Sequence, residues 1–207
     1  METTKPSLSA VVFCGPSGAG KSTLIGRLLK NYPNRLGYSV SHTTRAPREG
    51  EVNGREYFFV DREQMLQLER DGKFLEMCTV HGNMYGTTID AVKQVREQGK
   101  ICVVDIDVKG AKKLREGSAL KDMFYIFVTA PSLDVLRDRI QKRGADSEEV
   151  LQRRLNTAVE EFRFLEGNAG FFTHVITNDD LEQAYKEVLE VLEKELERCG
   201  MEKLQKY

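Results

Sequence analysis

Residues 15–22 read GPSGAGKS and match the phosphate-binding pattern G-x-x-x-x-G-K-[ST]. The glycines allow a tight turn whose backbone N–H groups point inward at anionic oxygens, and Lys21 adds a mobile cation. Residues 8–14 form an apolar run that suits a buried parallel strand, and residues 23–29 have helical spacing. A strand, a glycine loop and a helix in this order predict a site for a nucleoside triphosphate, with the helix N-terminus facing the phosphates. The alternative, a glycine-rich turn that binds nothing, is weakened by this context.

Length and composition limit the classes of protein that the chain can belong to. Its 207 residues suffice for one compact α/β domain with attachments, and 31 basic against 32 acidic residues give a net charge of −1. This balance provides no global attraction to nucleic acid or to an anionic membrane, so we expect neither as a partner. The four cysteines lack metal-ligand spacing and indicate neither zinc nor disulfides. Because no signal sequence and no apolar stretch near the ~20 residues of a membrane span occurs, we expect a cytoplasmic protein.

Three further apolar runs follow the first, at residues 101–107, 124–128 and 174–177. Residues 90–98 are amphipathic, and residues 181–204 read as a docked helix with a solvated, charged end. Strands that are apolar on both faces and alternate with helices predict a parallel sheet covered on both sides. In such a fold a ligand binds at the carboxyl ends of the strands.

Two stretches interrupt this alternation. The first, within residues 37–86, is rich in Tyr, Phe, Thr and turn residues, and residues 55–60 read as a strand outside the main sheet. The second, residues 132–167, is charged and helical, with Ser132 and either Asp146 or Ser147 as helix caps. We interpret the first as a substrate-binding insertion and the second as a lid. The predicted division is a core at about 8–40, 90–131 and 168–207, an insertion at about 41–89 and a lid at about 132–167.

Arg45 and Arg48 lie close together in a segment whose proline disfavours a continuous helix. Both guanidinium groups can therefore converge on one small anion, and bidentate binding of a phosphate is their obvious use. Tyr57 and Tyr85 each lie beside a turn signal and could add phenolic donors to the same phosphate. Taken alone, the two arginines would more often be solvated charges, and Tyr57 a packing residue in a strand.

Glu76 follows an apolar pair and precedes Met77, which is an awkward place for a carboxylate unless something pairs with it. Guanine presents adjacent N1–H and N2–H₂ donors that a carboxylate can accept together, whereas adenine presents an acceptor at N1 and would be repelled. Ser41 and Thr87 offer hydroxyls for the remaining base edges. Each of these three residues alone would more often be an ordinary turn or surface residue.

Asp105 and Asp107 end the predicted strand at residues 101–107, where an open α/β sheet places functional groups. Asp105 could orient a magnesium ion through water while Ser22 ligates it, and Asp107 could face a second nucleotide. For Asp107 the alternative role is to cap the next turn.

Basic residues of the predicted lid form another candidate set. Arg139 and Arg143 are four residues apart and hence on one helix face, and Arg154 lies in the next predicted helix. If the lid closes, these guanidinium groups can neutralise charge that develops during phosphoryl transfer. Pairing with nearby carboxylates on a solvated face is the competing interpretation. A phosphate nucleophile needs no general base, and we assign none of the three scattered histidines to catalysis.

Several segments together resemble the guanylate kinase family, from about residue 11 to residue 185. The segments that carry the resemblance are GPSGAGKST from Gly15, SVSHTTRAPREGEVNGREYFFV from Ser39, FLE at 74–76, GNMYGT from Gly82, DID at 105–107 and QRRL from Gln152. The resemblance implies a P-loop NTPase fold of three layers, with a parallel sheet, an inserted GMP-binding subdomain and a helical lid. It also implies transfer of a phosphoryl group from ATP to GMP, and by extension to dGMP, with Mg²⁺ accompanying ATP, and we expect a monomer.

The resemblance also implies roles for particular residues. The resemblance implies that Lys21, Arg48, Arg143 and Arg154 are the catalytic residues. The GMP ligands are Ser41, Arg45, Arg48, Tyr57, Glu76, Tyr85, Thr87 and Asp107. The ATP ligands are Gly15, Pro16, Ser17, Gly18, Ala19, Gly20, Lys21, Ser22, Thr23, Arg139, Asn178 and Asp179. From the residues themselves we expect the metal to be held by Ser22 and, through water, by Asp105. The chain departs from the family in having Thr87 where Ser is frequent, and the match fades past Glu193.

Two other functions compete with this expectation. Guanylate-kinase-like modules of membrane-associated scaffold proteins share the fold but bind peptides, and they have altered phosphate loops. This chain keeps Gly20, Lys21 and Ser22, which argues against a scaffold module. A kinase for AMP or a pyrimidine nucleotide is the nearer rival, and the set Ser41, Glu76 and Thr87 opposes it.

Overall fold

The computed structural model describes residues 8–80, 82–117, 122–142 and 147–205. Five parallel strands form the main sheet, in the spatial order β2 (Leu36–Tyr38), β7 (Ile101–Asp105), β1 (Ala10–Cys14), β8 (Met123–Thr129) and β9 (His174–Thr177). The four predicted strands and their parallel arrangement are confirmed. The short strand β2 was not predicted, because a three-residue Leu-Gly-Tyr segment carries no pattern of its own and becomes a strand by pairing with β7.

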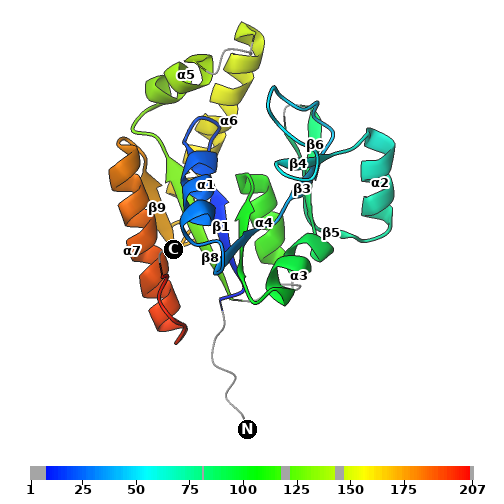
Figure 1. The fold of residues 1–207 in the computed structure, drawn as a ribbon. Helices are drawn as coiled ribbons and strands as arrows, with labels where there is room; N and C mark the ends of the chain where they lie inside the picture. Colours follow the sequence, from blue (N-terminus) through cyan, green and yellow to red (C-terminus); the bar gives the residue numbers. More distant parts are fainter. Residues whose placement is uncertain (1–7, 81, 118–121, 143–146, 206–207) are drawn as a thin grey trace.

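The main sheet is buried on both faces, which explains why β1 reads as a continuous apolar run. Val11 and Phe13 pack on the side of α1 (Lys21–Asn31) and α7 (Leu181–Arg198). Val12 and Cys14 pack on the side of α3 (Ile89–Glu97) and α4 (Val108–Glu116). Helices thus cover both faces of the sheet and give three layers, as Figure 1 shows. Among the described residues, no helix is long and apolar enough to cross a membrane.

A second, four-stranded sheet stands beside the main one, at the right of Figure 1. Its strands lie in the order β4 (Tyr57–Phe59), β3 (Ser41–Thr43), β6 (Asn83–Thr88) and β5 (Phe74–Val80). The strand predicted at residues 55–60 is therefore present as β4, outside the main sheet. Helix α2 (Arg62–Arg70) was not predicted, although Asp61 and Gln64 form a reciprocal capping box at its start.

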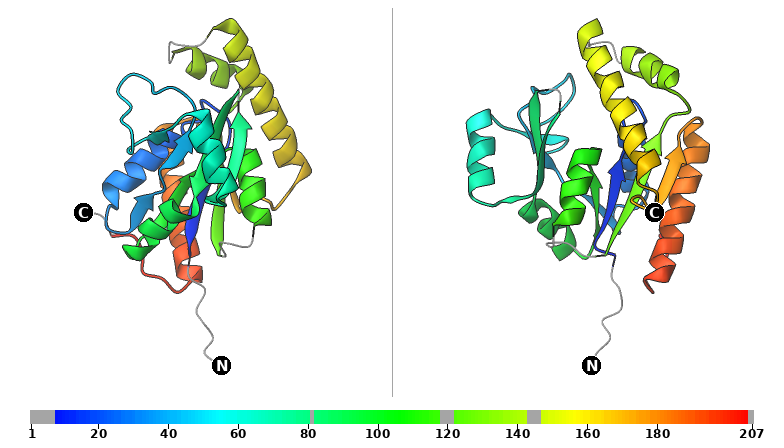
Figure 2. Two further views of the ribbon diagram at one scale, coloured as in Figure 1. Left: turned by 90° about the vertical axis from the view of Figure 1, so that its right-hand side faces the viewer. Right: turned by 180° about the vertical axis from the view of Figure 1, so that it is seen from behind.

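Two helices, α5 (Leu133–Lys142) and α6 (Glu148–Gly167), pack on each other above the carboxyl ends of the main strands. Ser132 and Ser147 accept hydrogen bonds from the first turns of these helices, as predicted. Helix α6 then continues down along the core, which Figure 2 shows from two further sides. The predicted residues Arg143 and Asp146 lie outside the described residues.

Two predicted boundaries are wrong. The strand expected at residues 101–107 ends at Asp105, because the Asp107 side chain accepts the Gly110 N–H and caps α4 instead. The helix expected over 181–204 ends at Arg198, and the charged side chains at its end, Lys194, Glu197 and Arg198, are exposed as predicted. The chain turns back after it, so that Cys199 and Leu204 are buried against the core.

Because Leu204 is buried beyond the last helix, we predict that Leu204→Ala lowers the free energy of unfolding by about 2 kcal/mol. The neighbouring exposed Lys203→Ala is the matched control and should change it by less than about 0.5 kcal/mol. Chemical denaturation of both variants measures the difference. Equal stability of the two variants would show that the C-terminal segment does not belong to the core.

Candidate nucleotide-binding site

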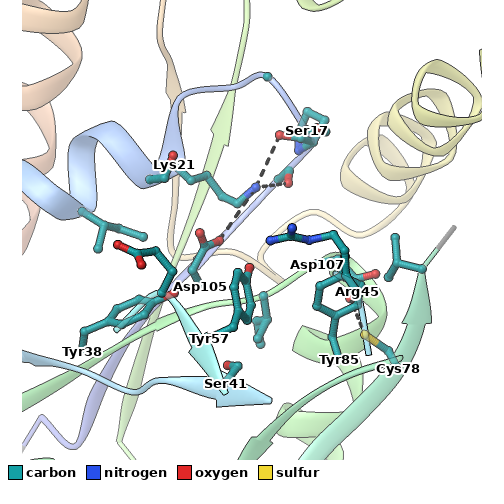
Figure 3. Close-up of a pocket in the computed structure, with 18 of the residues that line it drawn as sticks. Ser17, Lys21, Tyr38, Ser41, Arg45, Tyr57, Cys78, Tyr85, Asp105 and Asp107 are labelled. Carbon is teal, nitrogen blue, oxygen red and sulfur yellow. Dashed lines mark hydrogen bonds and ion pairs between the residues drawn. The ribbon is translucent and has the colours of Figure 1, made fainter. Parts of the chain in front are cut away.

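One cavity of about 620 Å³ brings together segments that are far apart in the sequence. The phosphate loop and the end of β7 line one part of it, the second sheet lines another, and α6 closes a side. Figure 3 shows Lys21 and Asp105 on one side of this cavity, with Ser41, Tyr57 and Tyr85 across from them. The cavity has room for groups from two ligands, one at the loop and one at the second sheet.

The phosphate loop is fixed by contacts that only glycine permits. Gly15 and Gly20 both have positive φ angles, and a Cβ at either position would overlap a neighbour, the Val128 carbonyl or the Asn178 amide. Asn178, buried at the end of β9, donates its side-chain N–H to the Ala19 carbonyl at 2.8 Å. The loop is thereby held from the neighbouring strand, and Asn178 is a support of the loop in this structure.

Lys21 folds back over its own loop. Its Nζ donates to the Gly15 carbonyl at 2.6 Å and lies 3.8 Å from Asp105 Oδ1. The pairing of Phe13 with Asp105 across β1 and β7 places this carboxylate beside the loop. Burial raises the pKa of Asp105, and the Lys21 charge opposes that rise. An ammonium group held by a carbonyl and a carboxylate is poised to exchange these partners for phosphate oxygens.

The residues beside the loop fit a magnesium ion that arrives with a nucleotide. Ser22 is exposed at the start of α1, and both Ser22 and Asp105 line the cavity. A hydroxyl and a carboxylate are the hard oxygen donors that Mg²⁺ prefers, and this ion usually takes its remaining ligands from water and phosphates. The exposed Thr23 follows at the same helix end.

The predicted phosphate-binding arginines lie in a loop organised by Glu51, a residue that the sequence analysis missed. Glu51 accepts both Arg45 Nη2, at 3.0 Å to each oxygen, and the Arg48 backbone N–H at 2.7 Å. The Arg45 guanidinium also lies 5.4 Å from the centre of the Tyr57 ring, which is 6.0 Å from the ring of Tyr85. The structure therefore brings Arg45, Tyr57 and Tyr85 together, while the exposed Arg48 reaches the cavity from the same loop. No sequence spacing marks Glu51, because its role depends on how this loop folds.

Glu76 is the most unusual side chain of the cavity. It is 4% exposed, its Oε1 accepts the Thr87 N–H at 2.8 Å, and its Oε2 has no hydrogen-bond partner among the described residues. The Thr87 hydroxyl lies 3.0 Å from that of Ser41. Burial raises the pKa of Glu76 to about 7, and the hydrogen bond from Thr87 limits the rise. The predicted trio of Ser41, Glu76 and Thr87 is thus assembled, with one buried acceptor left for a ligand.

Asp107 takes the capping role that was the alternative interpretation for it. Its Oδ1 accepts the Gly110 N–H at 2.8 Å and lies 3.4 Å from Cys78 Sγ, which donates to it. Asp107 still lines the cavity and is only partly buried. Asp107 can therefore cap α4 with Oδ1 and still contact a ligand with Oδ2.

Two arginines of the predicted lid already touch the nucleotide side of the site. Arg154 Nη1 donates to Ser17 Oγ at 3.0 Å, and Arg139 Nη1 donates to the Asn178 carbonyl at 2.8 Å. A weaker contact joins Arg139 to the Asp179 carbonyl at 3.3 Å. Helices α5 and α6 are therefore tied to the phosphate loop and to the end of β9.

Glu161 is a second buried acid that sequence reasoning missed. It lies on α6, lines the cavity and has an Oε2 without a hydrogen-bond partner among the described residues. Burial raises its pKa to about 7, and the nearby Lys21 lowers it. The signal was present in the sequence, because Glu161 follows Leu151, Leu155 and Ala158 on the buried face of the helix.

Comparisons with known proteins agree with this arrangement. Residues 7–195 match the family model described as guanylate kinase. Human guanylate kinase is 44% identical over 189 residues, which are 91% of this chain and 94% of that protein. Guanylate kinase 1 of rice is 46% identical over 182 residues, or 88% of this chain, and the chain spans about half (47%) of its length. The crystal structure of guanylate kinase from Anaplasma phagocytophilum superposes with a TM-score of 0.70 at 32% identity, covering 90% of this chain and 85% of that one. The chain belongs to the guanylate kinase family and has its P-loop NTPase fold.

Proposed function

We propose that this protein is an ATP:GMP phosphotransferase that converts GMP and ATP to GDP and ADP. The observation that carries the proposal is the buried Glu76 Oε2, an acceptor that no described residue pairs with, in the same cavity as the phosphate loop. A guanine base brings the adjacent N–H donors that such an acceptor requires. Family membership and the shared cavity support the same reaction.

In this proposal the two substrates divide the cavity. ATP lies on the phosphate loop, residues 15–23, with Arg139, Asn178 and Asp179 at its far side. The GMP phosphate binds to Arg45, Arg48, Tyr57 and Tyr85, and its base to Ser41, Glu76, Thr87 and Asp107. Mg²⁺, held by Ser22 and through water by Asp105, would neutralise charge on the ATP phosphates. By the same recognition dGMP is a substrate, since none of these contacts requires the ribose 2′-hydroxyl.

The reaction joins a GMP phosphate oxygen to the γ-phosphorus of ATP and breaks the bond to the oxygen that leaves with ADP. No side chain has to remove a proton, since the second pKa of a phosphate monoester is about 6 and the nucleophile is already ionised at neutral pH. Lys21, Arg154 and the predicted Arg143 stabilise the charge on the transferring group. Residues 41–89 act as the GMP-binding insertion and residues 132–167 as the lid. We propose that the protein works as a cytoplasmic monomer.

A coupled assay that offers GMP, dGMP, AMP, CMP and UMP with ATP and Mg²⁺ tests the proposal. We expect turnover with GMP and dGMP and little with the other three. Preference for AMP or a pyrimidine nucleotide would instead identify a different nucleoside monophosphate kinase. Absence of transfer to every acceptor would point to a non-catalytic module of the scaffold type.

We predict that Lys21→Ala lowers kcat by at least ~100-fold, because Lys21 contacts charge that grows during transfer. The variant should still fold, but it loses the Lys21 contacts with the Gly15 carbonyl and Asp105, so its unfolding transition is measured alongside its activity. Lys30→Ala, in the last turn of the same helix and exposed, is the matched control and should keep full activity. Steady-state kinetics and thermal unfolding of both variants give the comparison. Normal turnover by the Lys21 variant would contradict the assigned role.

We predict that Glu76→Gln lowers kcat/KM for GMP by about 30- to 1000-fold, because one acceptor becomes a donor that faces a donor. The corresponding value for AMP should fall far less or rise, since the repulsion of its N1 lone pair disappears. The measurement is the ratio of the two kcat/KM values in the wild type and in the variant. An unchanged ratio would mean that Glu76 does not read the base.

The raised pKa of Glu76, about 7, makes GMP binding dependent on pH. The ionised form accepts the guanine donors, so we predict that the Kd for GMP rises as the pH falls below 7, by up to about tenfold per pH unit. Protonation of the GMP phosphate near pH ~6 contributes to the same trend but acts equally on Glu76→Gln. The ratio of the two Kd values, measured by calorimetry from pH 5.5 to 8.5, therefore isolates Glu76. If that ratio is constant over this range, Glu76 does not titrate in the free protein.

A further inference from the structure

Gly110 is a buried glycine in the first turn of α4, where glycine costs about 1 kcal/mol of helix stability relative to alanine. Its backbone has ordinary helical angles, so conformational freedom does not explain the glycine. The explanation lies in the space around it. A Cβ at this position would lie 2.8 Å from Glu76 Oε2 and 3.3 Å from both Asp107 Oδ1 and Ile106 Cβ.

Gly110 lies beside both carboxylates. Its N–H donates to Asp107 Oδ1 at 2.8 Å, and its bare Cα leaves the space that Glu76 Oε2 occupies. This Oε2 is the atom without a partner among the described residues. Figure 3 shows Asp107 and Cys78 beside each other at this side of the cavity. The Cys78 thiol also donates to Asp107 Oδ1, so the position of this carboxylate is fixed from two elements.

If position 110 carried a side chain, only the carboxylate end of Glu76 would be free to move away from it. Its Oε1 accepts the Thr87 N–H, and its backbone is held in β5, where Glu76 pairs with Thr87 of the neighbouring strand β6. A methyl group at position 110 would therefore turn or shift the carboxylate end of the side chain. The carboxylate moves most readily, because its overlapping oxygen is the far end of a flexible side chain, whereas the contact with Ile106 Cβ has to widen by only a few tenths of an ångström.

We propose that Gly110 is a specificity-determining residue of the purine site, which keeps Glu76 Oε2 in position to read guanine. This inference rests on the proposed function, in which Glu76 accepts the guanine donors. Gly110 itself does not touch the base. It acts through Glu76 and, by its N–H, through Asp107.

Gly110→Ala is the test, with Gly167→Ala as matched control. Both glycines lie in helices, and a Cβ at Gly167 meets no atom within 4 Å. We expect Gly110→Ala to lower kcat/KM for GMP by roughly 10- to 100-fold, mainly through KM, and to leave the KM for ATP within about twofold. The GMP to AMP ratio of kcat/KM should fall with it, and the control should keep the wild-type ratio. A Gly110→Ala variant with the wild-type ratio overturns the proposal.

A double-mutant cycle separates an effect through Glu76 from a general structural effect. In a Glu76→Gln background, Gly110→Ala should change the GMP to AMP ratio by less than about twofold, because the atom that it displaces no longer reads the base. Multiplicative losses in the double variant would show that Gly110 acts independently of Glu76. They would overturn the inference.

A second comparison keeps the test valid if Gly110→Ala does not fold. In a Glu76→Ala background the overlapping oxygen is gone, so adding Gly110→Ala should leave the unfolding midpoint unchanged or higher, as expected for a glycine replaced in a helix. A lower midpoint would mean that the glycine is required for another reason. Should the wild-type protein fail to phosphorylate GMP, the proposed function is wrong; should it succeed while the Gly110 results fail, only this inference is wrong.

Discussion

The parallel pairing of β1 with β7 is the constraint on which the site depends. Both strands are buried on both faces, so neither can shift by one residue without turning apolar side chains out of their layers. The register that results sets Phe13 opposite Asp105. It therefore fixes the start of the phosphate loop and the acidic end of β7 at the same edge. Lys21 then spans the gap between them.

Near the carboxyl ends of β1 and β7, some buried polar groups do not have all of their hydrogen bonds. Glu76 and Glu161 are both buried, both have one oxygen without a partner among the described residues, and burial raises the pKa of both to about 7. A buried acceptor without a donor costs free energy in the nucleotide-free protein. A ligand that supplies the donor regains that free energy. Such a site discriminates strongly against a ligand that lacks the donor.

The chemistry of the site was largely predictable from local sequence, and its geometry was not. The phosphate loop follows from one octapeptide, and Glu76 is conspicuous because it interrupts an apolar run. Glu51, in contrast, organises Arg45 and Arg48 through a loop conformation that no spacing reveals. Arg143 lies outside the described residues, so its place in the site stays a prediction. The roles of Asn178 and Asp107 also depend on the fold. Asn178 donates to the Ala19 carbonyl of the phosphate loop, and Asp107 accepts the Gly110 N–H at the start of α4.

The class of fold, the parallel strands and the phosphate loop are all predictable from local sequence, because they depend on apolar runs, glycines and caps within a few residues of one another. Which polar groups face one another, in contrast, depends on how distant segments pack. Tertiary packing ended β7 at Asp105, turned the C-terminal segment back onto the core, made Leu36–Tyr38 a strand and left one oxygen of Glu76 without a donor in the part of the chain that the structure describes. The physical reason is that pairing and burial are relations between distant segments. A side chain's neighbours, and hence its pKa and its unsatisfied hydrogen bonds, exist only once those segments have packed.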